Sequence, residues 1–425
     1  MEKHDPKYAT YVAILERELM VAMGCTEPIA VAYCAAKARE LLGAMPDHVL
    51  VQVSGNIIKN VKSVIVPNTD GNKGIETAAA IGIAAGDASR ELEVISQVTE
   101  AGKVAMKELL QRNIIRMEPL DSPHALDIQI TLSGQGHSAM VHIVDAHTNI
   151  VEMVKDGQVL LVQGDAAQEV PQEELLYDLL DIESIYDFAV TCQLEDVRSP
   201  LERQIRCNTA ISEEGMRGDY GASVGKVLES MYGSDVRGHA KAMAAAGSDA
   251  RMNGCELPVV INSGSGNQGI TVSMPLVVFA ETLGSSEEAL LRALTLSNLI
   301  AIRLKAVIGR LSAYCGAVSA GAAAGAGIAY LKGADIRSIR HTIVNTLAIT
   351  SGIICDGAKA SCAAKIAISV EAGILGYEMF QQDKQFLSGD GIVAKGVENT
   401  IRNVGRLGSV GMHETDKEII RIMCD

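Results

Sequence analysis

"ALDIQITL", residues 125–132, alternates apolar and polar side chains, with Leu126, Ile128, Ile130 and Leu132 on one face. A period of two predicts a half-buried β-strand. Three further strand-like stretches follow, with turn residues between them: "SAMVHIVDA" (138–146), "NIVEMVK" (149–155) and "GQVLLVQG" (157–164). We predict that these four strands form an antiparallel meander.

Helices and strands also precede the meander. The pattern predicts helices over 9–23, 27–42 and 74–87, and strands over "HVLVQVSG" (48–55) and "VKSVIVP" (61–67). Beyond residue 185 strand signals stop and helical periodicity runs nearly to the C-terminus. Pro200 marks a domain boundary near residues 190–200. The expected fold is therefore an α+β domain over residues 1–195, followed by an all-helical domain over residues 196–425.

Composition narrows the classes of function. The 425 residues carry 37 Lys and Arg against 52 Asp and Glu, a net charge of −15, and no basic run is present. A nucleic-acid partner is therefore not expected. The chain has no Trp and only four Phe, whereas small residues are abundant, which favours closely packed helices in the second half.

Two features bear on location. The charged N-terminal stretch lacks the apolar core of a signal peptide, so we expect a cytoplasmic protein. "LSAYCGAVSAGAAAGAGIAYL" (311–331) is uncharged and long enough to span a bilayer, but Ala, Gly and Ser dominate it. We interpret it as a buried central helix and expect no membrane partner.

A glycine-rich loop stands out in the second half. "NSGSGNQGI" (262–270) holds Gly264, Gly266 and Gly269 in the spacing of a dinucleotide-binding loop and follows the strand-like "LPVVI" (257–261). No second strand with a ribose-binding acid follows, and in a chain with 40 glycines the spacing alone is weak. We therefore expect this loop to bind something other than a dinucleotide.

Nine cysteines occur, and in an intracellular chain they are core residues, metal ligands or catalytic thiols more often than disulfides. "TSGIICDGAKASCAAK" (350–365) places Cys355 and Cys362 seven positions apart beside glycines. This spacing is neither that of a zinc ribbon nor that of a ferredoxin, and a pair of core cysteines would also explain it. Cys315, also beside a glycine, could complete a three-thiolate site.

Several stretches together resemble the L-cysteine desulfidase family over essentially the whole chain. They are "GCTEPIA" (24–30), "SGNIIKNV" (54–61), "VPNT" (66–69), "GSGNQGI" (264–270), "YCGAVSAG" (314–321), "SGIICDGAKASCAAK" (351–365) and "GMHETDKEII" (411–420). A more distant likeness to the iron–sulfur L-serine dehydratases surrounds Cys315, Cys355 and Cys362. In that likeness Cys25 stands where the dehydratases have a histidine.

The resemblance implies β-elimination from L-cysteine, yielding sulfide, pyruvate and ammonia without pyridoxal phosphate. It implies that Cys315, Cys355 and Cys362 hold a [4Fe–4S] cluster whose open iron acts as a Lewis acid. Some serine dehydratases place a C-terminal cysteine on the cluster as a removable fourth ligand, and Cys424 is a candidate for the same role.

Other residues are expected to complete the site. Cys25, before a helix N-terminus that lowers a thiol pKa, is the candidate base or substrate contact, although a packed small residue would also fit there. The glycine loop suits the carboxylate of a small zwitterion. The expected substrate-binding residues are Thr26, Asn56, Asn60, Ser263, Ser265, Asn267 and Gln268, and Asn68 is a further candidate beside Asn56 and Asn60.

Alternatives stay open at this point. The same cluster could act on L-serine, because hydroxyl and thiol differ by one atom. A non-catalytic protein with a three-cysteine zinc site, or a small-molecule binding protein, is the alternative of another class. We expect a small amino-acid substrate. The oligomeric state stays open, with a homodimer as one alternative. The site is expected between the two domains, where both walls supply polar groups.

Overall fold

The computed structural model describes residues 1–162, 176–232, 235–309 and 311–424. Within residues 48–162 a six-stranded sheet runs in the order β3-β2-β4-β5-β6-β7. Its strands are β2 (His48–Val53), β3 (Ile115–Pro119), β4 (Asp127–Gly134), β5 (His137–Val144), β6 (Ile150–Lys155) and β7 (Gln158–Val162). Only β2 and β3 pair in parallel; all other neighbours are antiparallel.

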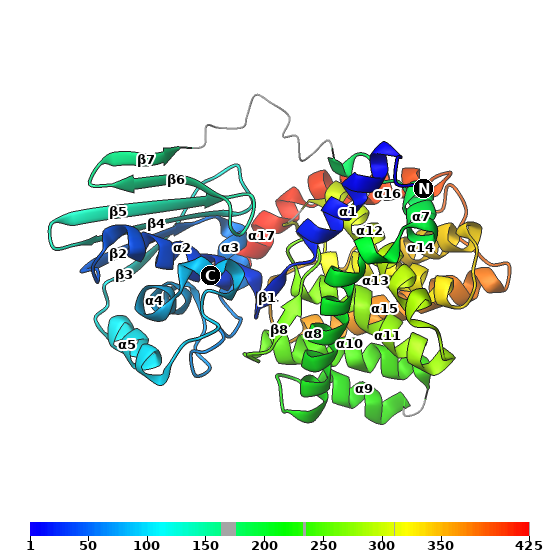
Figure 1. Cartoon of the computed structure of the whole chain (residues 1–425), viewed down its shortest axis with the longest axis horizontal. Coiled ribbons are helices and arrows are strands. Elements are labelled where there is room, and N and C mark those ends of the chain that lie inside the picture. The colour runs from blue at the N-terminus through cyan, green and yellow to red at the C-terminus, as the bar shows by residue number, and fades with distance from the viewer. Residues whose placement is uncertain (163–175, 233–234, 310, 425) are drawn as a thin grey trace.

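The alternation in β4 creates one buried face of the sheet. Ile128, Ile130 and Leu132 are fully buried, and β4 pairs with β5 from Asp127 opposite Val144 to Gly134 opposite His137. Helices cover this face in layers (Figure 1). They are α2 (Thr26–Leu42), which packs on β4 and β5, α4 (Ile75–Ala85) on α2, and α5 (Glu100–Gln111) on α4.

The second part of the molecule is built almost entirely from helices. At its centre lies α13 (Gly316–Leu331), whose small side chains let four neighbours approach closely. These neighbours are α11 (Gly266–Leu283), α12 (Glu287–Ile308), α14 (Ile336–Thr350) and α15 (Cys362–Gln381). The other helices are α7 (Ile182–Thr191), α8 (Arg198–Arg217), α9 (Val224–Tyr232), α10 (Val236–Met252) and α16 (Val397–Arg406).

Several local expectations differ from the structure. The helix expected over 9–23 is α1 (Pro6–Glu18), and the chain then forms β1 (Val21–Met23), which pairs antiparallel with β8 (Pro258–Val260). The strand expected over "VKSVIVP" is wrong, because α3 (Gly55–Val61) runs into that stretch and Ile65 makes only a single bridge to Lys73.

The packing does not divide at residue 195. The α1 helix precedes the sheet in sequence yet packs with the helical part, where Tyr8 and Tyr11 contact the Phe188 ring of α7 edge-on. Because α7 in turn packs on α12 and α14, both α1 and α7 belong spatially with the helices that follow them.

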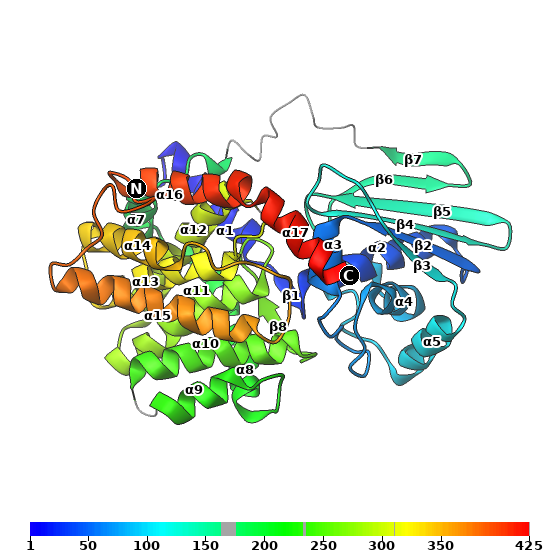
Figure 2. The same cartoon turned by 180° about the vertical axis from the view of Figure 1, so that it is seen from behind.

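A C-terminal helix connects the two parts. Figure 2 shows α17 (His413–Cys424) leaving the helical part and ending beside α3 and α2. Ile420 of α17 packs against Gly55, where a Cβ would lie 2.8 Å from its Cδ1 atom. Within the described ranges, none of the helices is long and apolar enough to cross a membrane.

Candidate active site

One cavity lies between the sheet part and the helical part, and most of the expected site residues line it. Its volume is about 100 Å³, smaller than the ~150 Å³ of a protein cavity that binds benzene, so it suits a small ligand and not a dinucleotide. The lining includes Cys25, Thr26, Glu27, Asn60, His147, Arg251, Ser263, Ser265, Asn267, Gln268, Lys305, Tyr314, Cys315, Cys355 and Cys362.

Four helices point their N-termini at this cavity. Cys25 is the N-cap of α2, Ser265 that of α11 and Cys315 that of α13, and Cys362 is the first residue of α15. Each N-terminus carries unpaired N–H groups and a partial positive charge. Their convergence gives the cavity a potential that favours thiolates and carboxylates.

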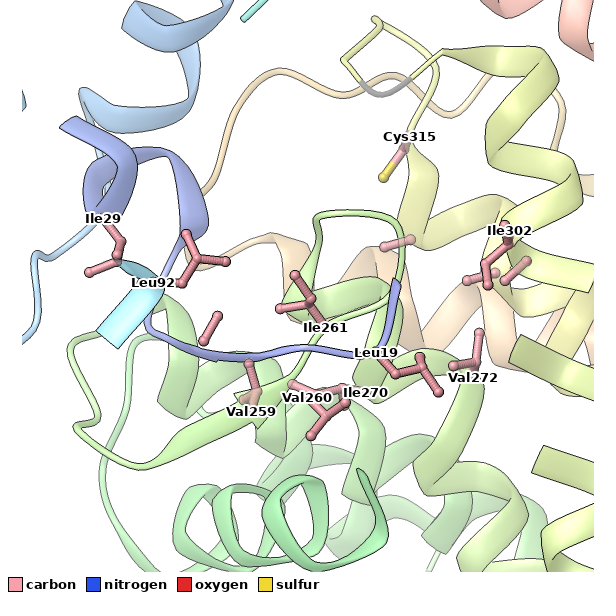
Figure 3. Close-up of a cluster of buried hydrophobic side chains, with 14 of the residues drawn as sticks. Leu19, Ile29, Leu92, Val259, Val260, Ile261, Ile270, Val272, Ile302 and Cys315 are labelled. Carbon is pink, nitrogen blue, oxygen red and sulfur yellow. The ribbon is translucent and has the colours of Figure 1, made fainter. Parts of the chain in front are cut away.

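The loops before α13 and α15 hold Cys315 and Cys355 side by side. The Cys315 N–H donates to the Ile353 carbonyl at 3.3 Å, the Cys355 N–H donates to the Ala313 carbonyl at 2.6 Å, and Tyr314 bridges to Ile354. Cys362 joins them on the same cavity wall, with its thiol 3.7 Å from the Gly357 carbonyl. Figure 3 shows Cys315 together with buried apolar side chains of the core, Ile261 and Ile302 among them.

Two buried lysines supply positive charge to these sulfurs. A hydrogen bond from Cys315 lowers the pKa of Cys355 to about 5, with help from the charges of Lys59 and Lys305 and against the effect of burial. The same hydrogen bond, together with burial, raises the pKa of Cys315. Burial lowers the pKa of Lys305, and the nearby Cys355 and Cys315 oppose this effect only in part. Lys59 is 1% exposed and forms an ion pair with Asp416 of α17.

The glycine loop shapes the opposite wall. Ser263 and Gly264 both adopt the left-handed conformation, at φ 50° and φ 80°, and turn the chain from β8 into α11. A Cβ on Gly269 would lie 2.1 Å from the Val260 carbonyl, so this glycine lets the helix pack directly on the strand. The loop therefore serves close packing and a small cavity, and among the described elements α11 is followed by another helix, α12, where a dinucleotide fold would have a strand.

The loop side chains differ in what they already bind. Ser265 caps its own helix by accepting from the Gln268 N–H, and Ser263 donates to Asn262. Gln268 Nε2 also donates to Asn262, at 2.7 Å. The Asn267 Oδ1 and Gln268 Oε1 atoms are buried without a hydrogen-bond partner among the described residues. These two oxygens are free for a ligand.

Cys25 lies in the cavity, but its expected low pKa is wrong. Burial, and then the Glu27 carboxylate, raise the pKa of the Cys25 thiol well above its usual value. Its Sγ–H donates to Glu27 Oε2 at 3.1 Å, so the adjacent carboxylate outweighs the helix N-terminus. Cys25 is therefore a neutral thiol, and it packs in one small apolar cluster with Cys362.

Thr26 and the asparagines separate into different roles. Thr26 donates to the Gly264 carbonyl at 2.8 Å and so holds α2 against the glycine loop. Asn60 lines the cavity, whereas Asn56 does not, and the Asn56 carbonyl accepts from Asn60 Nδ2. Asn68 donates to the Ile95 carbonyl and supports a turn away from the cavity.

The sequence analysis missed five acidic, basic or histidine residues that line the cavity: Glu27, Asp145, His147, Arg251 and Lys305. The Glu27 carboxylate is ionised: burial opposes this, but the nearby His147 and the Cys25 thiol lower its pKa to about 2. His147 Nε2 lies 3.9 Å from Glu27 Oε1, an ion-pair distance beyond hydrogen bonding. Of these residues only Glu27 belongs to a stretch, "GCTEPIA", that carries the family resemblance.

The donor set fits an iron–sulfur cluster better than a single ion. Within the described ranges, no three Cys, His, Asp or Glu side chains converge on a point where one metal ion would sit. A zinc ion needs its thiolates at about 2.3 Å, whereas the ligands of a cluster bind different irons and stand farther apart. Three cysteines on one wall, attended by two lysines, match the second arrangement. The side chain of Cys424 is outside the described residues.

Comparison with known proteins agrees with this donor set. The family model described as "Serine dehydratase alpha chain" matches residues 89–421. A UPF0597 protein of Desulfitobacterium hafniense is 56% identical over 100% of this chain and 98% of its own length. Others from Lachnoclostridium phytofermentans and Finegoldia magna are 51% and 49% identical, each over 98% of this chain and 99% of their own length. The chain therefore belongs to the serine dehydratase alpha chain family.

Proposed function

We propose that the protein is an iron–sulfur-dependent carbon–sulfur lyase that converts L-cysteine to sulfide, pyruvate and ammonia. The observation that carries the proposal is the cavity itself. Three cysteines line it beside Lys59 and Lys305, and two residues of α11 with unpartnered amide oxygens line the same cavity. Family membership supports a lyase, and the resemblance to L-cysteine desulfidases supports cysteine as the substrate.

Cys315, Cys355 and Cys362 would hold a [4Fe–4S] cluster, and Lys59 and Lys305 would offset its negative charge. When bound, the cluster would supply an open iron as a Lewis acid toward the leaving sulfur. The four helix N-termini favour the same negative charge without adding titratable groups.

The elimination balances without an external oxidant or reductant. A base takes the Cα proton, the Cα–H electrons form the Cα=Cβ bond, the Cβ–S bond breaks, and sulfur leaves with its electron pair as sulfide, which takes up a proton in turn. The aminoacrylate product then hydrolyses to pyruvate and ammonia. Cys25 contacts the substrate as a neutral thiol; as a base it would first have to pass its proton to the hydrogen-bonded Glu27 carboxylate. Enclosure by both parts of the molecule keeps water from the reacting atoms.

L-serine is the second candidate substrate, favoured by the name of the family model. The direct test is turnover by anaerobically purified protein, with pyruvate and sulfide measured separately. We expect equal pyruvate and sulfide from L-cysteine, at a higher kcat/KM than pyruvate from L-serine. Faster turnover of serine would assign the enzyme as a dehydratase. Failure to turn over either amino acid with the cluster loaded would contradict the lyase proposal.

A further inference from the structure

Arg251 is a buried cation that nothing in the described protein neutralises. It lies near the end of α10, its side chain lines the cavity, and the residue is 2% exposed. Among the described residues no carboxylate oxygen lies within 4.0 Å of its guanidinium, whereas Lys59 and Glu27 each have a partner of opposite sign or a histidine within that distance. Its Nε has no hydrogen-bond partner in that part of the chain, and Nη1 reaches only the Met252 sulfur, at 4.0 Å.

An unpaired buried guanidinium costs free energy unless an anion joins it. The cavity must therefore offer Arg251 such a partner when the site is filled. The guanidinium lies against the start of α11: a Cβ on Gly266 would be 2.3 Å from Arg251 Nε and 2.8 Å from Cζ. Glycine at this position leaves room for the fork beside the N–H groups of the first helical turn.

The positive charges of the cavity are divided between two ends. Lys59 and Lys305 act on Cys315 and Cys355, whereas Arg251 acts on Cys25. Lys305 also reaches the edge of the other wall, because it interacts with Glu27 and because a Cβ on Gly316 would lie 2.9 Å from both Lys305 Nζ and Gln268 Oε1. Arg251 is the cation that lies against the first turn of α11. The other titratable groups that line the cavity are Glu27, which accepts hydrogen bonds from Cys25 and Thr26, His147, which faces Gly264, and Asp145, which pairs with His124.

We infer that Arg251 and the first turn of α11 form the subsite for the α-carboxylate of the amino-acid substrate. This inference rests on the proposed function and adds its specificity residue. A planar fork binds a carboxylate through two parallel hydrogen bonds, and the helix N-terminus adds donors and positive charge. Asn267 Oδ1, unpartnered on the same turn, is placed to accept from the substrate ammonium.

The test uses two half-substrates that cannot yield aminoacrylate. 3-Mercaptopropionate has the carboxylate and thiol without the amine, and cysteamine has the amine and thiol without the carboxylate. Calorimetric binding of each would be measured for wild type, Arg251→Met and Arg251→Lys, under anaerobic conditions. Arg303→Lys is the matched control, because Arg303 is also largely buried but pairs with Glu398 outside the cavity. Iron content and thermal midpoints would show that each variant is folded.

We expect Arg251→Met to weaken 3-mercaptopropionate roughly 10- to 100-fold, the range for a lost charge-assisted pair, and to leave cysteamine within about threefold. Arg251→Lys should fall between, because it keeps the charge and loses the fork. In turnover, the same loss should appear mainly in KM for L-cysteine. Unchanged 3-mercaptopropionate binding in Arg251→Met, or equal weakening of both compounds, would overturn the inference, as would a wild type that binds no 3-mercaptopropionate.

The two proposals fail separately. A protein without lyase activity that still binds 3-mercaptopropionate through Arg251 would refute the lyase and keep the carboxylate subsite. A lyase whose 3-mercaptopropionate binding and KM do not change when Arg251 is replaced would keep the lyase proposal and refute the carboxylate subsite.

Discussion

Replacing Asp416 with Asn should loosen the contact between α17 and the site. Asp416 is the partner of Lys59, and their side chains are only 13% and 1% exposed. Removing one member of a buried ion pair costs about 3–5 kcal/mol, because the other charge stays buried without compensation. Asn keeps the shape of the side chain, so we expect the lower end, about 3 kcal/mol.

That free energy converts to a measurable shift in Tm. At about 2.1 cal/mol/K of unfolding entropy per residue, 425 residues give roughly 0.9 kcal/mol/K if the chain unfolds as one unit. A loss of 3 kcal/mol then lowers the Tm by about 3 °C. Differential scanning calorimetry would measure it on protein without cluster, so that loss of iron does not contribute.

Glu414→Gln is the matched control, because Glu414 lies on the same helix with a side chain 75% exposed and an ion pair to Lys417. Surface pairs contribute about 0–1 kcal/mol, so its Tm should move by about 1 °C or less. The double variant Lys59→Met with Asp416→Asn should lose less stability than Asp416→Asn alone, since the Lys59 charge is no longer left without its partner. Equal shifts for Asp416→Asn and Glu414→Gln would refute the reasoning.

Three further predictions concern the cavity and its walls. Cys25→Ala should retain iron and sulfide but lose most turnover of L-cysteine; normal turnover would remove Cys25 from the reaction. Gly269→Ala places a Cβ 2.1 Å from the Val260 carbonyl, so it should destabilise by about 2 kcal/mol or more in chemical denaturation, and a loss below about 0.5 kcal/mol would contradict the close packing. The lowered pKa of Glu27, about 2 against an ordinary 4.5, stabilises the fold above pH 4.5, and that stabilisation fades as pH falls toward 2. The free energy of unfolding of wild type should therefore exceed that of Glu27→Gln by roughly 3 kcal/mol at pH 7 and by less at pH 3.5. A difference that does not change with pH would refute the lowered pKa of Glu27.

The sheet could be predicted from the sequence because its signal is local. Ile128, Ile130 and Leu132 alternate within β4, and the partner strands follow after short turns. By contrast, β1 has three residues and gains its partner, β8, from the far half of the chain. The helix α1 is equally nonlocal, because Tyr8 and Tyr11 bury themselves against Phe188. No local pattern encodes such pairings.

The candidate site was predictable where a motif carried it. The three cysteines and the glycine loop came from quoted stretches, and all of them line the cavity. Arg251 lies in an ordinary helical pattern, and its place in the site became visible only in the structure, where its guanidinium packs against Gly266. The pKa of Cys25 was mispredicted because a helix N-terminus is visible in sequence, whereas the hydrogen bond to Glu27 depends on side-chain geometry.

The most direct test of the central claim is the iron and acid-labile sulfide content of anaerobically purified protein, together with its absorbance near about 400 nm, where thiolate-bound iron–sulfur clusters absorb. Cys315→Ala, Cys355→Ala and Cys362→Ala would be compared with wild type, and Cys207→Ala, a change on α8 outside the cavity, would be the control. We predict about four irons per chain and a brown colour in wild type and Cys207→Ala, with both lost in each of the other three variants. A colourless wild type containing zinc, or a cluster retained when Cys355 is replaced, would contradict the account.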